Sequence, residues 1–88
     1  MEKEILHLIT TYNSIDRKII KRNLKKVYRE VGFSNKNIID DLGMEKNKVD
    51  AWTNSRSNNI PTFEDALRLS IKYGFSIREL IEVKEQES

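Results

Sequence analysis

The 88-residue chain is predicted to fold as an all-α domain. Apolar residues recur at spacings of three, four and seven over several short stretches, as on the buried face of an amphipathic helix. Each of the three glycines follows one of these stretches, at positions 32, 43 and 74, where a left-handed residue typically ends a helix. The composition, 38% hydrophobic with a single Pro, is typical of a globular helical domain rather than a disordered chain.

The helix starts can also be predicted, because residues that typically cap helix N-termini stand just before several of the apolar stretches. Ser34, Thr62 and Ser76 are the expected caps. Thr62 is followed three residues later by Asp65, and Ser76 by Glu79, which makes the second pair a capping box in form. Glycine stops and polar starts together divide the chain into short helices.

The first two helices are predicted from the apolar periodicity of the N-terminal third. A short helix precedes Asn13 and Ser14 and carries Ile5, Leu6, Leu8, Ile9 and Tyr12. The longest helix is expected from about Ile15 to Val31, with the apolar stripe Ile15, Ile19, Ile20, Leu24, Val27, Tyr28 and Val31. Its other side forms a continuous basic face of Arg17, Lys18, Lys21, Arg22, Lys25, Lys26 and Arg29.

Two shorter helices follow, at about Lys36–Leu42 and about Glu45–Thr53, with Gly43 between them. Their expected buried residues are Ile38, Ile39, Leu42, Met44, Val49 and Trp52. Residues 54–61 are polar, turn-prone and closed by Pro61, so they are expected to form a loop.

The last helices are expected at Phe63–Tyr73 and at about Ile77–Val83. Spacing predicts that the first of them buries Phe63, Ala66, Leu67, Ser70 and Ile71. The expected organisation is an N-terminal extension helix at 1–14, a helical domain at 15–83 and a frayed tail at 84–88.

Several function classes are not expected for this chain. It has no Cys, and its single His, His7, lacks partners at metal-ligand spacing, so no metal site and no cofactor are predicted. Asp40 and Asp41 are adjacent on a helix and point about 100° apart, which does not suit paired acid–base catalysis. No catalytic residue and no small-molecule ligand are expected. The charged N-terminus predicts neither a signal peptide nor a membrane span, and we expect a cytoplasmic protein.

Positive charge is concentrated at the N-terminal end of the sequence. Residues 1–33 carry eight Lys and Arg against four Asp and Glu, residues 34–60 carry four against four, and residues 61–88 carry four against six. The net charge of +2 therefore hides a local excess of positive charge.

The two short helices joined at Gly43 have the pattern of a helix-turn-helix pair. The first helix packs across the second and braces it, so that the second can place its polar face in the major groove of DNA. If Val49 and Trp52 point inward, the outward stripe comprises Lys46, Asn47, Asp50, Ala51 and Asn54. Lys46 could donate to guanine, Asn47 could pair with adenine, Ala51 could contact a thymine methyl, and Asp50 could accept from cytosine or neutralise Lys46.

A longer series of motifs resembles a known family. In order, these are Gly32-Phe33-Ser34, Ile38-Ile39-x-x-Leu42-Gly43-Met44, Val49-x-x-Trp52, Pro61-Thr62-Phe63 and Tyr73-Gly74-Phe75-Ser76-Ile77-x-x-Leu80-Ile81. The series is similar to the lambda-repressor/Cro-like (XRE-type) helix-turn-helix domain over about Ile20 to Ile81. The resemblance implies a compact five-helix fold, to which the N-terminal helix is an addition. It also implies sequence-specific binding of double-stranded DNA, commonly as a homodimer.

The residues expected to act follow from this pattern. Base reading is assigned to Lys46, Asn47, Asp50 and Ala51. Contacts to the DNA backbone are assigned to Asn35 and Lys36, which stand where the family grips phosphates, and to Lys48, Asn54, Arg56 and Asn58. Whether the basic face of the long helix reaches DNA stays open.

The sequence leaves two functions and two dimer surfaces open. The leading function is a transcriptional regulator, a repressor or Cro-like protein of a phage, plasmid or mobile element. The alternative is a protein-interaction module on the same fold: an antitoxin, an anti-defence inhibitor or a replication or partition adaptor. The neutral balance of residues 34–60 keeps it open. The dimer contact is assigned either to the N-terminal helix or, by slight preference, to a C-terminal patch of Phe75, Ile77, Ile81 and Val83.

Overall fold

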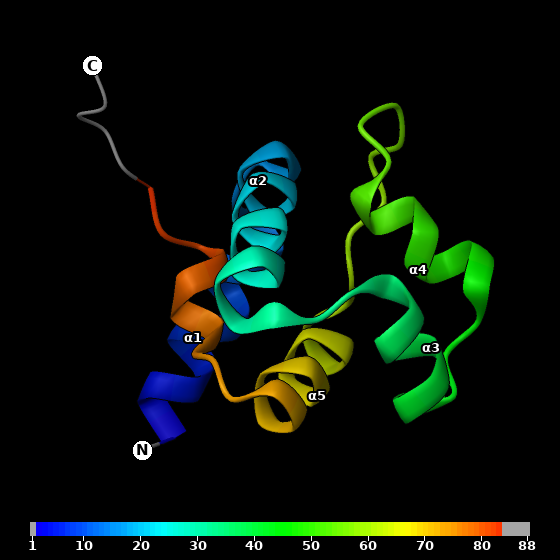
Figure 1. Ribbon diagram of the computed structural model, residues 1–88. Helices are drawn as coiled ribbons and strands as arrows, with labels where there is room; N and C mark the ends of the chain where they lie inside the picture. The colour runs from blue at the N-terminus through cyan, green and yellow to red at the C-terminus, as the bar shows by residue number, and fades with distance from the viewer. Residues whose placement is uncertain (1, 84–88) are drawn as a thin grey trace.

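The computed structural model describes residues 2–83, and these residues form helices without any strand, which confirms the all-α class. The elements are α1 (Glu2–Ser14), α2 (Arg17–Val27), a π-helical turn η1 (Tyr28–Gly32), α3 (Asn35–Leu42), α4 (Lys46–Thr53), α5 (Phe63–Tyr73) and a 3₁₀ turn η2 (Ile77–Leu80). Figure 1 shows α3 and α4 on one side of the molecule and α1 on the other. The tail that was expected to fray, 84–88, lies outside the described residues.

Helix α1 is joined to the rest of the domain through Tyr12. This side chain is fully buried, its hydroxyl donates to the main-chain oxygen of Pro61 at 2.7 Å, and its ring meets the edge of Phe63 at 5.6 Å between centroids. Towards its N-terminus, α1 leaves Ile5 and Leu6 exposed. One end of α1 therefore belongs to the core, and the other carries apolar side chains on the surface.

The long helix expected over 15–31 is shorter and ends differently. Asp16 caps α2, because its carboxylate accepts from the main-chain N–H of Lys18 at 2.9 Å. After Val27 the helix widens into the π turn η1, closed by the bond from Phe33 N–H to Tyr28 O at 3.2 Å. A π turn adds a residue per turn, which moves later side chains out of phase with the apolar stripe. Val31 is consequently exposed, whereas Phe33 enters the core.

Helices α3 and α4 are delimited by the residues that the sequence indicated. Ser34 caps α3 and exchanges hydrogen bonds with Asn37 in a capping box. Gly43 ends α3 with φ 66°, a left-handed conformation that favours glycine. Glu45 precedes α4 as its N-cap residue but makes no side-chain capping bond.

Helix α5 has the predicted bounds and buries Ala66 and Ser70 as predicted, but its buried face is rotated from the expected one. Leu67 and Ile71 were expected in the core, yet they are 42% and 76% exposed, whereas Leu69 is 0% exposed. The stripe that packs inward is Ala66, Leu69, Ser70 and the half-buried Tyr73. Both stripes satisfy helical spacing, so periodicity alone could not select the phase.

The C-terminal helix expected over 77–83 is only the 3₁₀ turn η2. Ser76 and Glu79 form the predicted capping box. The amide of Asn23 donates to Leu80 O and Glu82 O, both at 2.9 Å, and so binds main-chain oxygens at the end of the turn and just after it. The C-terminal patch is not an exposed surface: Phe75 and Ile77 are buried and Ile81 is half-buried, which leaves Val83 exposed.

Candidate nucleic-acid interface

Helix α4 presents the polar face that the sequence predicted. Val49 and Trp52 are fully buried beneath it. Lys46 and Asn47 are exposed on its outer side, and Asp50 and Ala51 are half-buried. All four base-reading candidates therefore lie on one short helix whose opposite side is fixed in the core.

Two of these candidates are paired with each other. The Lys46 ammonium lies 2.6 Å from Oδ2 of Asp50, one turn along α4. The hydrogen bond from Lys46 is the main cause that lowers the pKa of Asp50, and a bond from Asn35 adds to it. The pair cancels one positive charge on the outer face of α4, so this face carries little net charge.

Asn35 links three elements through its side-chain amide. Its Oδ1 accepts from the Tyr28 hydroxyl at 2.8 Å, and its Nδ2 donates to Asp50 Oδ1 at 3.2 Å and to Thr53 Oγ1 at 3.0 Å. Both amide hydrogens are thus used within the protein. This side chain, for which a phosphate contact is predicted, holds α3 and α4 together beside η1.

The other residues predicted to contact the DNA backbone either pair with a carboxylate or lie on the loop that follows α4. Lys36 pairs with Asp40 at 2.9 Å, and Lys48 pairs with the nearly buried Asp65 at 2.9 Å. Asn54, Arg56 and Asn58 are exposed on the loop that follows α4. The Asn58 main-chain oxygen accepts from Arg17 at 3.3 Å, which ties this loop to the start of α2. The two lysines carry neutralised charges, and Arg56 is the cation on the loop.

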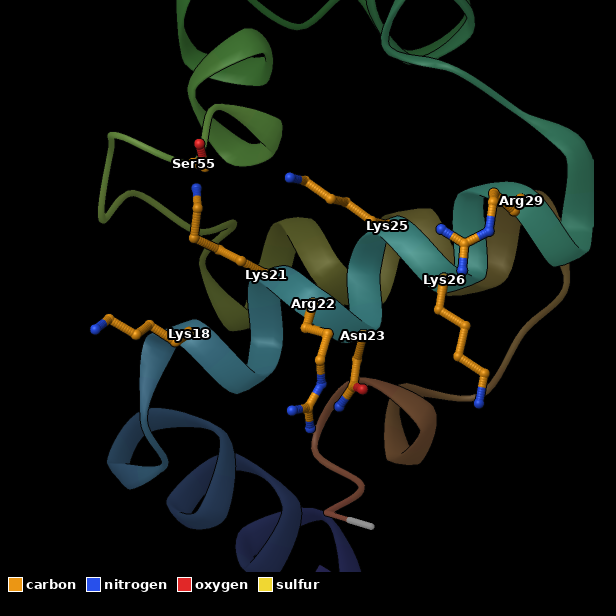
Figure 2. A pocket seen from close by; sticks show the side chains of 8 residues that line it. All are labelled: Lys18, Lys21, Arg22, Asn23, Lys25, Lys26, Arg29 and Ser55. Atoms are coloured by element: carbon orange, nitrogen blue, oxygen red, sulfur yellow. The ribbon is translucent and has the colours of Figure 1, made fainter. Parts of the chain in front are cut away.

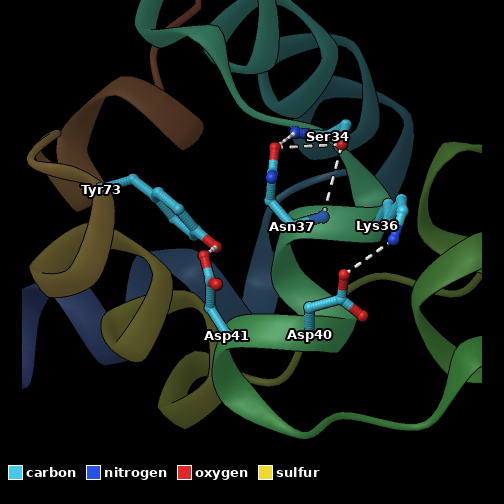
Figure 3. Close-up of polar contacts among 6 residues, drawn as sticks. All are labelled: Ser34, Lys36, Asn37, Asp40, Asp41 and Tyr73. Carbon is cyan, nitrogen blue, oxygen red and sulfur yellow. Dashed lines mark hydrogen bonds and ion pairs between the residues drawn. The ribbon is translucent and has the colours of Figure 1, made fainter.

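The two adjacent acidic residues near the end of α3 each bind a different partner (Figure 3). Asp40 holds Lys36, and Asp41 accepts from the Tyr73 hydroxyl at 2.9 Å. Burial of the ring and the hydrogen bond to Asp41 raise the pKa of Tyr73 to about 12. The two carboxylates serve different partners, so they do not form a shared acid–base pair.

Sequence reasoning missed the role of Lys21. Its ammonium donates to Ala51 O at 2.8 Å, Trp52 O at 2.9 Å and Asn59 O at 3.0 Å, and the residue is only 7% exposed. The last carbonyls of a helix lack partners within it and carry partial negative charge, so a cation suits this place. The pKa of Lys21 is lowered, mainly because the ammonium is buried and to a smaller extent because Lys25 repels it. Its position beside Ile20 at the edge of the apolar stripe was the available signal, hidden in a run of cations.

Most of the cations of α2, together with Arg29 of η1, border an open hollow of about 700 Å³, shown in Figure 2. We call this feature the basic hollow. It is lined by Lys18, Lys21, Arg22, Asn23, Lys25, Lys26, Arg29 and Ser55. Lys21 and Lys25 extend from α2 towards the segment that carries Ser55, which follows α4 (Figure 2). The expected basic face is therefore largely present, except that the Lys21 ammonium is bound to main-chain oxygens and Arg17 lies outside the hollow.

Within residues 2–83, no group of His, Cys, Asp or Glu is arranged to hold a metal ion. His7 is exposed on α1. None of the described helices is both long and apolar enough to span a membrane. Comparison with protein-family models, with curated proteins and with solved structures finds no match.

Proposed function

We propose that this protein is a sequence-specific, double-stranded DNA-binding regulator of transcription that reads the major groove with α4. The observation that carries the proposal is the α3–α4 pair. Gly43 turns the chain between two short helices, Val49 and Trp52 fix α4 from beneath, and its polar side faces solvent. Helix α4 has the length and the exposed donors that groove reading requires.

Asn47 and Lys46 are assigned the principal base contacts. Asn47 is exposed, and its amide can pair with the N6 and N7 atoms of adenine. The Lys46 ammonium gives one hydrogen bond to Asp50 and keeps two donors for guanine O6 and N7. Asp50, held by Lys46 and Asn35, keeps the lysine over the outer face, and Ala51 offers its methyl group to thymine. Asn54, Arg56 and Asn58 on the following loop are assigned to phosphates.

The regulator is proposed to act in the cytoplasm as a homodimer, as a repressor or Cro-like protein of a phage, plasmid or mobile element. Of the two dimer surfaces considered, α1 has more to offer, because Ile5 and Leu6 are exposed while most of the C-terminal patch is buried. No cofactor enters this function.

Selection of binding sites from random duplex DNA tests the proposal. An enriched sequence is expected, and a palindrome would give the half-site spacing of a dimer. Asn47→Ala should relax the preference at one position, whereas Arg56→Ala should weaken all sequences alike. Lys72→Ala, at an exposed cation on α5, is the control and should change neither. Selection that enriches no sequence would contradict the proposal.

A second candidate is favoured by one observation on α5. Leu67 and Ile71 lie one turn apart and are 42% and 76% exposed, although both are large and apolar. Exposed apolar pairs of this kind occur at protein contacts. The second candidate is a protein-interaction module: an antitoxin, an anti-defence inhibitor or a replication or partition adaptor. It would be favoured if no DNA sequence is enriched and an identified protein partner binds the wild type but not Leu67→Lys or Ile71→Lys.

A further inference from the structure

The basic hollow on α2 holds positive charge that no described acidic residue neutralises. The ion pairs within residues 2–83 involve Lys36, Lys46, Lys48 and Arg68 and none of the cations of α2. No carboxylate lines the hollow. Five of its cations, Lys18, Arg22, Lys25, Lys26 and Arg29, are left to face solvent or a ligand. Like charges gathered in this way repel one another and concentrate anions from solution.

The hollow is also attached to the end of α4. Lys21 binds the main-chain oxygens of Ala51 and Trp52, and Ser55 just beyond them forms the opposite wall. At the other end of α2, Tyr28 stands next to Arg29 and bonds to Asn35, which bonds in turn to Asp50 on the outer side of α4. The hollow therefore adjoins the end of the proposed reading helix through Lys21, and the segment that carries Arg29 is linked to that helix through Tyr28 and Asn35.

The shape of the cation row indicates an extended ligand. Lys18 and Arg29 are separated by eleven residues of α2 and η1, roughly 16 Å at the helical rise. That length matches about five base-pair steps of one DNA strand at 3.4 Å each. A compact anion would engage a few of these side chains and leave the others uncompensated. A polyanion lying along α2 would engage the row.

We propose that the basic hollow binds the sugar-phosphate backbone of the duplex that α4 reads, beyond the base pairs that α4 contacts. This inference rests on the proposed function, since it assigns a second contact to the same duplex. Ser55 and the arginines donate hydrogen bonds to phosphate oxygens, and the lysines supply charge. The contact adds affinity and sets the register of the protein on DNA without reading sequence.

The test combines charge removal with the length of the duplex. The selected site is prepared twice, once with several flanking base pairs on each side and once trimmed to the core. Lys25→Gln/Lys26→Gln is compared with wild type and with the matched control Lys72→Gln/Arg78→Gln, which removes the same charge from exposed positions on α5 and η2. Thermal unfolding by circular dichroism establishes that each variant folds, and binding is measured over a range of salt.

On the long duplex, the double variant of α2 should reduce the slope of log K against log salt by about two. Over a fourfold rise in salt it should therefore lose roughly tenfold less affinity than wild type. Its sequence preference should be unchanged, the control should keep the wild-type slope, and trimming the flanks should abolish the difference.

The possible failures are distinguishable. If wild type selects a sequence but the α2 variant and the control have equal slopes on the long duplex, the inference is wrong and the proposed function stands. If the difference persists on the trimmed duplex, the hollow does not bind the flanks. If wild type binds no duplex, both proposals fall. Binding to phosphatidylserine vesicles but not to duplex would likewise overturn both, in favour of a lipid surface.

Discussion

The Tyr12 hydroxyl donates a hydrogen bond of 2.7 Å to the main-chain oxygen of Pro61, so α1 is attached where the chain enters α5. Tyr12→Phe keeps the ring against Phe63 and removes this bond. Because the acceptor would stay buried without a partner, we expect a loss of about 2 kcal/mol in the free energy of unfolding. Urea unfolding measures it. Asn13→Ala, at an exposed neighbour, should change little, and an equal loss in both variants would contradict this account.

Lys21→Met tests the anchoring of α4. The substitution keeps most of the aliphatic stem but leaves three main-chain oxygens without their charged donor. We expect the protein to lose about 2 kcal/mol or more of stability, and amide hydrogen exchange should accelerate in the last turn of α4 and around Asn59. Lys18→Met removes a charge from the same helix at an exposed position. In this variant, amide exchange in α4 and around Asn59 should stay as in wild type. Unchanged exchange in α4 of Lys21→Met would show that the three bonds do not hold it.

Gly43 should tolerate side chains according to their backbone preference rather than their size. A Cβ at this position would meet nothing within 4 Å, but the residue has φ +66°. Gly43→Ala should cost about 1 to 2 kcal/mol of stability, because an L-residue with a Cβ is strained in the left-handed region. Gly43→Asn should cost less, since asparagine enters this region more readily. Thermal or urea unfolding compares the two, and a larger loss for Asn would argue for crowding.

Stability should fall in alkaline solution because of the tyrosines. All three, Tyr12, Tyr28 and Tyr73, have pKa values raised chiefly by burial, that of Tyr73 to about 12. The unfolded chain loses these protons near the ordinary value of 10.0, while the folded protein keeps them. The unfolded state then binds fewer protons, so stability falls as pH rises from 10 towards 12. Urea unfolding across this range measures the loss.

Tyr73→Phe is the matched variant for this loss of stability in alkaline solution. Because it lacks one of the three phenol groups, its free energy of unfolding should decline less than that of wild type as pH rises. Tyrosinate absorbance gives an independent reading. If it appears near pH 10 while circular dichroism still reports the folded helices, the raised pKa values are wrong.

Much of the helical layout could be predicted because the signals that set it are local. Gly43 and Gly74 end helices through their own φ angles, and Ser34, Thr62 and Ser76 cap helices by bonding to main-chain N–H groups two or three residues away. The inward positions of Val49 and Trp52 were also predicted correctly. Each of these features is determined within about one helical turn.

The features that could not be predicted depend on contacts between residues that are distant in the sequence. The phase of α5 is settled by what packs on it, so Leu69 rather than Leu67 enters the core. Lys21 looks like one cation among seven until its three acceptors, thirty or more residues away, are brought to it. The hydrogen bonds of the Asn35 amide could not be predicted, because nothing in the sequence shows that Tyr28, Asp50 and Thr53 converge on it.

Helix α3 is held near both ends by phenol groups from outside the α3–α4 pair: Tyr28 bonds to Asn35 at its start and Tyr73 bonds to Asp41 near its end. Two such attachments oppose both rolling and sliding of this short helix. A partner that docks on α4 would therefore meet a backbone already in its final position. Any adjustment of fit falls to exposed side chains such as Asn47, or to the shape of the partner itself.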